Sequence, residues 1–409
     1  MTFSSPESMM FSCLFFANVG KALDSVNLDQ HNQHMTWLER EAALHKLGVK
    51  AQTLYAYVSR GQISAQTHPN DPRASLYSEA DIDALVKRRR RGRSRSDIAS
   101  AAIAWGDPVM ETAITTVRNG RLIYRGADAV RLASHASLEE IAALLWQSDP
   151  LTPVKPDAEY DPGRSGKERA FNYLARRAAE VDTPIAAINN FSAHGASLLI
   201  GFADAISGKT GRGLFHQRLA RFWKLDPNGA DLLRRTLVLV ADHELNPSSF
   251  AARVTASTNA SLAACTLSGY ATLTGPRHGE ASARALLFLR HYTLNSVTKA
   301  PAQTLARIET TPGMGHALYP KGDPRAKALL RWMQPDPQIK RTVRMAERIS
   351  GKPANIDMAL AALCLKLDLP DDAPFLIFAA GRMVGWIAHA REQSISGKMI
   401  RPRAKYLGD

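Results

Sequence analysis

The sequence is poor in cysteine and contains no long apolar run. Its three cysteines, Cys13, Cys265 and Cys364, lie far apart in 409 residues and form no C-x-x-C pair. This spacing argues against a disulfide framework or a structural zinc site, and it fits a reducing cytoplasm. No stretch reaches the roughly 18 consecutive apolar residues of a membrane-spanning helix. The apolar stretch 9–19 also lacks the preceding positive charge of a signal peptide. We therefore expect a cytoplasmic chain with no membrane partner.

Positive charge is in excess, but it is unevenly distributed. The formal net charge is +14; residues 1–100 hold 13 Lys or Arg and 10 Asp or Glu, and the remainder holds 39 and 28. Most of the excess thus belongs to the C-terminal part, which suits anionic small substrates as well as nucleic acid. The chain length predicts at least two folding units.

The hydrophobic pattern divides the chain into three parts. Residues 1–34 show no sustained period and predict a disordered leader, so Met35 is an alternative start. Residues 36–92 predict a small domain that ends in the basic run 87–95. From about residue 98 to 409, apolar residues recur at helical spacing and predict a mainly α-helical body. Within it, 113–124 predicts a β-hairpin around Asn119-Gly120.

The small domain has the order of elements found in helix-turn-helix proteins. Residues 41–47 and 50–58 predict two helices joined at Gly48, and Ser78 predicts the cap of a third. The pattern over 37–86 resembles the MerR and excisionase-like winged helix-turn-helix family. That resemblance implies DNA contacts by Gln52, Thr53, Tyr55 and Arg60, with phosphate contacts from the basic run. A docking or dimerisation domain without DNA binding remains the alternative.

Four segments of the body carry polar residues that ordinary helices do not select. They are 241–250, 275–280, 312–325, and the group formed by 353–357, 381–386 and 401–403. Each has a structural explanation when taken alone. A histidine beside glycine is commonly a hydrogen-bonded turn residue, Asp357 fits a helix cap, and arginines are common surface charges. A functional assignment therefore depends on all four segments taken together.

That set resembles the citrate synthase family from about Thr112 to Gly408. The matching blocks read ADHELN, GPRHGEA, PGMGHALY, DPRA, NID, GRMVGWIAHAREQ and IRPR. The resemblance implies all-helical large and small domains, the small mobile one at roughly 280–372. It also implies that the chain joins an acyl-CoA to oxaloacetate, by enolisation and aldol-type addition, to give citrate and CoA. Coenzyme A thioester is then a substrate, and no metal or redox cofactor is expected.

The resemblance also assigns residue roles. Asp357 is expected to remove a proton from the acyl-CoA methyl group, and His278 to donate a hydrogen bond to the thioester oxygen. His316 is expected to polarise the oxaloacetate ketone. The carboxylates are expected to bind His243, Arg325, Arg382 and Arg401. Because the last of these comes from the partner subunit in this family, a homodimer at least is implied. CoA contacts are expected from Gly313, Met314, Gly315 and, more weakly, Lys321.

Some positions depart from the family pattern. Glu280 stands where many members carry glycine, and Ser282 replaces a common asparagine. The segments between His278 and His316 and between Arg325 and Asp357 are short for the family. The choice between acetyl-CoA and propionyl-CoA, the 2-methylcitrate synthase substrate, therefore stays open. A metabolite-sensing transcriptional regulator and a citryl-CoA cleavage enzyme are also compatible with these residues. His389 is expected to pack inside its helix.

Overall fold

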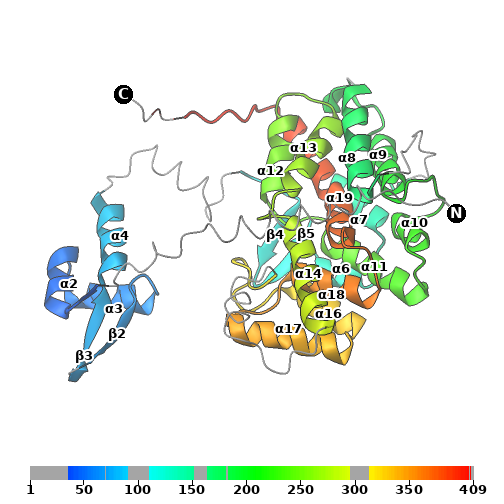
Figure 1. The fold of residues 1–409 in the computed structure, drawn as a ribbon. Coiled ribbons are helices and arrows are strands. Elements are labelled where there is room, and N and C mark those ends of the chain that lie inside the picture. Colours follow the sequence, from blue (N-terminus) through cyan, green and yellow to red (C-terminus); the bar gives the residue numbers. More distant parts are fainter. Residues whose placement is uncertain are drawn as a thin grey trace, which may run out of the picture. The chain divides into compact units, whose positions relative to one another are not determined.

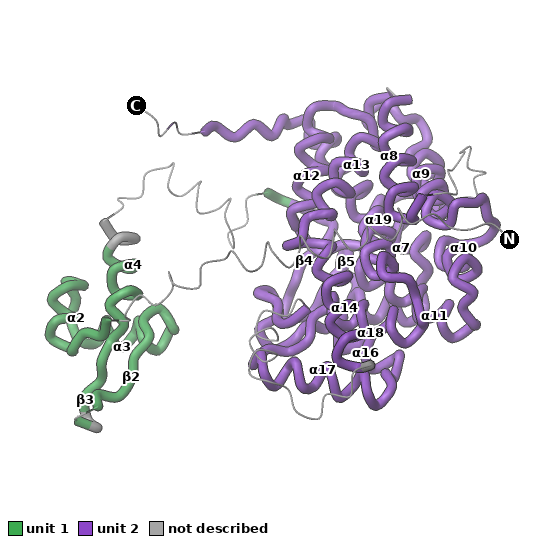
Figure 2. Tube along the Cα trace, in the orientation of Figure 1, with its two compact units in different colours: residues 1–111 green, residues 112–409 purple. Residues whose placement is uncertain are grey.

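The structure is a computed structural model that describes residues 36–69, 71–90, 110–151, 164–180, 183–294, 313–404 and 406. It forms two compact units, residues 1–111 and 112–409, coloured separately in Figure 2. The expected leader, most of the basic run and the expected boundary between 92 and 98 lie outside the described residues.

In its described residues, the first unit has three helices and a small antiparallel sheet. Its elements are β1 (Trp37–Leu38), α2 (Arg40–Leu47), α3 (Ala51–Ser59), β2 (Ala65–His68), β3 (Asp71–Ser78) and α4 (Glu79–Arg90). The strand order is β1-β3-β2. Gly48 ends α2 in the left-handed region, which glycine adopts without strain. The Ser78 hydroxyl accepts a hydrogen bond from the amide of Asp81, as expected for the cap of α4. Apolar side chains from all three helices form its core.

The second unit begins with the expected hairpin. Its strands are β4 (Thr115–Arg118), β5 (Arg121–Tyr124) and the short β6 (Ala127–Asp128), paired in that order. Asn119 and Gly120 both have positive φ, of 52° and 71°, as a two-residue turn of type I′ requires. The hairpin prediction is confirmed.

The remaining described residues of the second unit are mainly helical, which confirms the mainly α prediction. Its helices are α6 (Ala129–Ala133), α7 (Leu138–Trp146), α8 (Gly166–Glu180), the 3₁₀ turn η2 (Ile185–Ala187), α9 (Phe191–Ser207), α10 (Phe215–Phe222), α11 (Pro227–Leu239), α12 (Pro247–Ala256), α13 (Leu262–Leu273), α14 (Glu280–Leu294), α16 (Pro324–Met333), α17 (Pro337–Ser350), α18 (Ile356–Lys366) and α19 (Ala373–Ser396). In α11, α12 and α16 an Asp or Asn cap precedes a proline at the first helical position. This sequence signal fixes a helix start locally.

Helix α19 forms the centre of this unit (Figure 1). It packs against α7, α9, α11, α12, α13 and α14. By length and composition it would be apolar enough to cross a membrane, but it is buried among these helices. The Trp386 ring lies against Gly269 of α13, where a side chain would collide with it. Helix α19 is therefore the core helix of the body.

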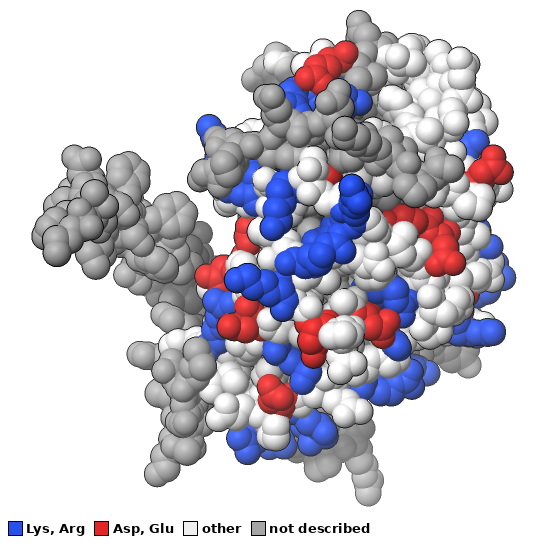
Figure 3. Space-filling model, turned by 90° about the vertical axis from the view of Figure 1, so that its right-hand side faces the viewer, with Lys and Arg blue, Asp and Glu red and all other residues white. Residues whose placement is uncertain are grey.

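The helices α14, α16, α17 and α18 group together, in the lower part of the body in Figure 1. Helix α18 contacts both α14 and α16, while α17 contacts α14. On the face seen in Figure 3, Lys and Arg side chains alternate with acidic ones. On that face, positive charge is mixed with negative charge.

Candidate functional site

Two of the expected histidines, His243 and His316, lie close to each other where α11 and α16 pack together. His243 follows α11, and His316 lies in the turn before α16; their ring centroids are 4.9 Å apart. The Tyr319 hydroxyl lies 3.0 Å from Nε2 of His243. Burial and the charge of Arg325 hold the pKa of His243 well below its usual value and lower the pKa of His316 to about 4. Both rings are therefore neutral near pH 7.

Arg325 reaches the same cluster from the first turn of α16. Its guanidinium lies 5.6 Å from the centroid of the Tyr319 ring. Its Nε and Nη2 bind the two carboxylate oxygens of Asp323 at 3.0 and 2.8 Å. Asp323 also accepts a hydrogen bond from the amide of Ile356, at the start of α18, at 3.1 Å. One carboxylate thus anchors both the arginine and the helix that carries Asp357.

Asp357 stands at the second position of α18 and is partly buried. Asn355 caps the helix instead, because its Oδ1 accepts from the amide of Asp357 at 2.9 Å. Among the described residues, no hydrogen bond reaches the carboxylate of Asp357. The pKa of Asp357 is raised to about 7, mainly by burial; Arg325 and Arg382 oppose the rise, whereas Asp323 contributes to it. A carboxylate in this state is a stronger base than an ordinary aspartate.

The glycine-rich turn is joined to the segment that precedes Asp357. Gly315 donates its amide to the carbonyl of Pro353 at 2.7 Å, and Asn355 donates its amide to Gly313 at 2.9 Å. The Asn355 side chain also donates to Gly315 at 2.9 Å. Gly313 has φ of 91°, and a Cβ there would lie 2.9 Å from the amide nitrogen of Met358. Only glycine allows this close approach.

His278 lies in the turn between α13 and α14, and α12 holds it. Its Nε2 is 2.9 Å from the hydroxyl of Ser248. The Ser248 hydroxyl is also 2.7 Å from Oδ1 of Asn246, so its single proton has two possible acceptors. Burial, assisted by the charge of Arg382, lowers the pKa of His278 to about 4. This histidine is therefore neutral near pH 7 as well.

Arg382, on α19, is the residue whose charge acts on both His278 and Asp357. It is fully buried, and its Nε donates to the carbonyl of Val240 at 3.0 Å. Its guanidinium lies over the ring of Phe378, which also contacts His278. Burial lowers the pKa of Arg382 to about 10, which still leaves it charged near pH 7.

Three expectations stay predictions, because this single chain without ligand does not test them. Arg401 is exposed in an extended tail after α19. Lys321 is exposed, and its backbone carbonyl accepts a hydrogen bond from the amine of Lys327 at 2.7 Å. Within the described residues, no hydrogen bond or ion pair joins Asp357 to His278 or His316; the charge of Arg382 acts on both Asp357 and His278.

The unusual residues beside His278 have local partners. Glu280 forms an ion pair with Lys167 of α8, which neutralises the negative charge near the turn. The Ser282 hydroxyl is buried and donates to the carbonyl of Gly279 at 2.8 Å. Both residues therefore stabilise the start of α14.

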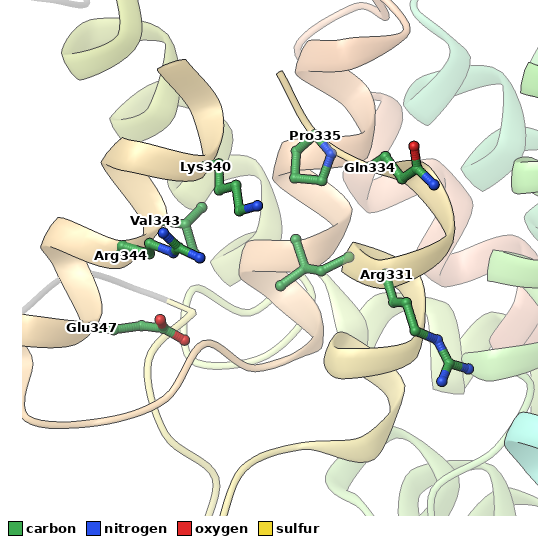
Figure 4. Close-up of a pocket in the computed structure, with 8 residues that line it drawn as sticks. Arg331, Gln334, Pro335, Lys340, Val343, Arg344 and Glu347 are labelled. Carbon is green, nitrogen blue, oxygen red and sulfur yellow. The ribbon is translucent and has the colours of Figure 1, made fainter. Parts of the chain in front are cut away.

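A separate cavity of about 490 Å³ lies between α16 and α17 (Figure 4). It is lined by Leu330, Arg331, Gln334, Pro335, Lys340, Val343, Arg344 and Glu347. None of the expected site residues lines it. The cationic residues that line the cavity, Arg331, Lys340 and Arg344, are exposed, so the cavity is open to solvent.

Sequence reasoning missed the residues that support the expected ones. They are Asp242, Asn246, Ser248, Tyr319, Asp323, Asn355, Phe378 and His389. Ser248 and Tyr319 fall within the polar segments 241–250 and 312–325, so their positions were a usable signal. His389 was expected only to pack, but it is hydrogen-bonded to Asp242 at 3.3 Å.

Comparisons with known proteins bear on the body alone. The family model "Citrate synthase, C-terminal domain" matches residues 103–159 and 154–403. A citrate synthase of Haloferax volcanii is 30% identical over 347 residues, covering 71% of this chain and 90% of that protein. A 2-methylcitrate synthase of Shewanella oneidensis is 26% identical, covering 74% of this chain and 93% of that protein.

Solved structures give the same picture. The crystal structure of citrate synthase from Thermotoga maritima has a TM-score of 0.58 and 25% identity, and the match covers 74% of this chain and 94% of that one. A Thermoplasma acidophilum citrate synthase in a ternary complex with carboxymethyl coenzyme A and oxaloacetate has a TM-score of 0.58 and 20% identity, with the same coverage. At 20% identity, the similarity to the Thermoplasma acidophilum structure supports the fold alone.

Proposed function

The chain belongs to the citrate synthase family of enzymes, and on this premise we propose that it condenses acetyl-CoA with oxaloacetate to give citrate and free CoA. One observation carries the proposal. A carboxyl group with a pKa of about 7 and neutral imidazoles lie around two buried guanidinium groups. A base, hydrogen-bond donors and dicarboxylate-binding groups are what an enolisation and aldol-type addition requires.

Asp357 acts as the base in this proposal. Its carboxylate has no hydrogen bond among the described residues, so it is free to take a proton from the methyl group of the acyl-CoA. His278 stabilises the enol that forms. When the Ser248 hydroxyl donates to Nε2, the neutral ring carries its proton on Nδ1 and can donate from there to the thioester oxygen.

His316 polarises the ketone of oxaloacetate. Its Nδ1 accepts a hydrogen bond from the amide of Leu318 at 3.2 Å. Because an amide can only donate, the proton of the neutral ring is on Nε2. That proton is available to the ketone oxygen, which makes the attacked carbon more electrophilic.

The two carboxylates of oxaloacetate bind to His243, Arg325, Arg382 and Arg401 of the partner subunit. Planar guanidinium groups bind carboxylates bidentately, which favours arginine here. Exposed apolar residues support a homodimer. Ile395 lies in the last turn of α19, Met399 and Tyr406 follow this helix, and Leu287 lies on α14. An interface with a second copy of the chain would remove such side chains from water.

CoA lies along Gly313, Met314 and Gly315, with Lys321 near a phosphate. Lys352 extends beside Gly315 and is a further candidate for this contact. A movement of the small domain, roughly 280–372, brings Asp357 and His278 together around the thioester. The chain is expected to act in the cytoplasm, with CoA as substrate and no metal or redox cofactor.

A coupled assay tests the proposed reaction. Purified protein is mixed with oxaloacetate and acetyl-CoA, and free thiol is followed; propionyl-CoA in parallel tests the 2-methylcitrate alternative. Asp357→Ala is expected to abolish turnover while oxaloacetate binding stays nearly unchanged. A large loss of that binding would mean that another residue is the base, and no turnover with either thioester would refute the enzymatic proposal.

The first unit is proposed to bind DNA through α3. Gln52 and Tyr55 are exposed one turn apart on this helix, with Arg60 just beyond its end, and Thr53 is partly exposed beside them. The paired strands β2 and β3 follow α3 in the chain and would serve as the wing. Helices that expose such side chains enter the major groove in helix-turn-helix proteins.

Salt-dependent DNA binding by the full chain tests this second proposal. Arg60→Ala is expected to weaken binding and to lower the salt slope by about 1. Arg131→Ala, which removes a charge from the body, serves as the control. Binding that is absent at low salt would favour a docking role.

A further inference from the structure

Three consecutive residues before His243 are held against α19, each by its own contact. The carbonyl of Val240 accepts from Nε of Arg382 at 3.0 Å, and the carbonyl of Ala241 accepts from the amide of Gly385 at 3.1 Å. Oδ2 of Asp242 lies 3.3 Å from Nε2 of His389. The backbone leading to His243 therefore follows one stripe of α19.

Two glycines on that stripe make the approach possible. A Cβ at Gly385 would lie 2.4 Å from Oδ1 of Asp242, and a Cβ at Gly381 would lie 2.7 Å from the carbonyl of Leu237. Side chains at these positions would push the segment away from α19. The segment has little freedom to shift.

The proton of His389 is fixed by its second neighbour. Arg253 of α12 is buried, and its Nη1 lies 3.5 Å from Nδ1 of His389. A guanidinium only donates, so Nδ1 accepts and Nε2 carries the proton of a neutral ring. His389 therefore donates to Asp242, which stays an ionised acceptor.

Arg253 is itself held in place. Its Nε donates to Gln393 at 3.0 Å, and its Nη1 pairs with Glu392 at 2.7 Å. The other oxygen of Glu392 accepts from the amide of Ala113 at 2.9 Å. The chain Glu392–Arg253–His389–Asp242 is thus a continuous polar network through the core.

The network also matters for charge. Burial alone would raise the pKa of Asp242, but His389 and Arg382 hold it below its usual value. The negative charge of Asp242 in turn raises the pKa of the buried Arg382, against the larger effect of burial. Asp242 is therefore a counter-ion for an arginine whose guanidinium has no carboxylate partner among the described residues.

We propose that His389, oriented by Arg253, is a positioning residue for the oxaloacetate site, because it fixes Asp242 and through it the orientations of His243 and Arg382. This inference rests on the proposed function. It predicts that the network governs dicarboxylate binding more than acyl-CoA binding.

Binding of oxaloacetate to the full chain, measured by isothermal titration calorimetry, tests the inference. His389→Leu removes both contacts and is expected to weaken binding about tenfold. The KM for acetyl-CoA is expected to change less than about twofold, because no hydrogen bond among the described residues joins His389 to the glycine-rich turn. His389→Gln supplies one donor and one acceptor, so it is expected to restore most of the affinity.

Trp386→Phe is the matched control. Trp386 lies on the same helix and is fully buried, and its Nε1 has no hydrogen-bond partner in the described part of the chain. It is expected to lower thermal stability without changing oxaloacetate binding. The inference is overturned if His389→Leu leaves binding within about twofold of wild type, or if Gln is no better than Leu. Oxaloacetate binding without thiol release would instead refute the proposed reaction alone.

Discussion

The raised pKa of Asp357 makes the proposed reaction sensitive to pH in a defined direction. Its pKa is about 7, whereas His278 and His316, at about 4, stay neutral across the neutral range. Only the ionised carboxylate accepts a proton. Lowering the pH from about 8 to about 6 reduces the ionised fraction from about 0.9 to about 0.1, so kcat/KM for acetyl-CoA is expected to fall about tenfold.

Thiol release at saturating oxaloacetate, measured from about pH 5 to pH 9, gives this profile. One ionisation near pH 7, with a plateau above it, is the expected result. A rate that stays flat down to about pH 5 would refute the reasoning, because a base with an ordinary carboxyl pKa is ionised throughout that range.

The same carboxyl also affects stability. Its folded pKa of about 7 lies above its unfolded value, so the folded chain binds the extra proton between about pH 4 and pH 7. Asp357 therefore opposes folding increasingly as the pH rises through this window, and fully above it. Three units correspond to about 4 kcal/mol, which partial exposure reduces to about 2 kcal/mol. Asp357→Asn should raise the free energy of unfolding at about pH 8 and leave it unchanged at about pH 4; an equal gain at both values would contradict this account.

Three further substitutions have definite expected outcomes. Ser248→Ala removes the hydroxyl that contacts Nε2 of His278, so kcat should fall about tenfold while oxaloacetate binding, measured by calorimetry, is unchanged. Tyr319→Phe removes the hydroxyl beside His243 and should raise the KM for oxaloacetate about fivefold in the thiol assay. Gly385→Ala places a Cβ 2.4 Å from Asp242. Thermal denaturation should show a loss of about 2 kcal/mol.

Local signals in the sequence predicted the elements that depend on neighbours in the chain. The Asn119-Gly120 turn, the Ser78 cap and the helical period of the body are of this kind, and the structure contains all three. The reacting residues were identified through a family resemblance that the comparisons now support at the level of the family.

The supporting residues were not predictable in the same way. Asp323 holds Ile356, and His389 holds Asp242, across segments that meet only after folding. Asp323 and Asp242 fall within the polar segments 312–325 and 241–250, but nothing in the local sequence identifies the distant groups that they bind. Asp357 matched a helix-cap pattern, yet the cap proved to be Asn355, two residues earlier. In the sequence, a carboxylate at the start of a helix is compatible with a helix cap and with a base. Only the geometry distinguishes the two roles.

The double attachment of Asp323 limits how this site can evolve. A single side chain secures the arginine proposed to grip the keto acid and the helix proposed to present the base. A mutation that moves the arginine will also move the helix that carries the base. Binding of the keto acid and proton abstraction therefore cannot change independently through this residue. Diversification toward other thioesters must therefore arise from positions that this shared anchor does not hold.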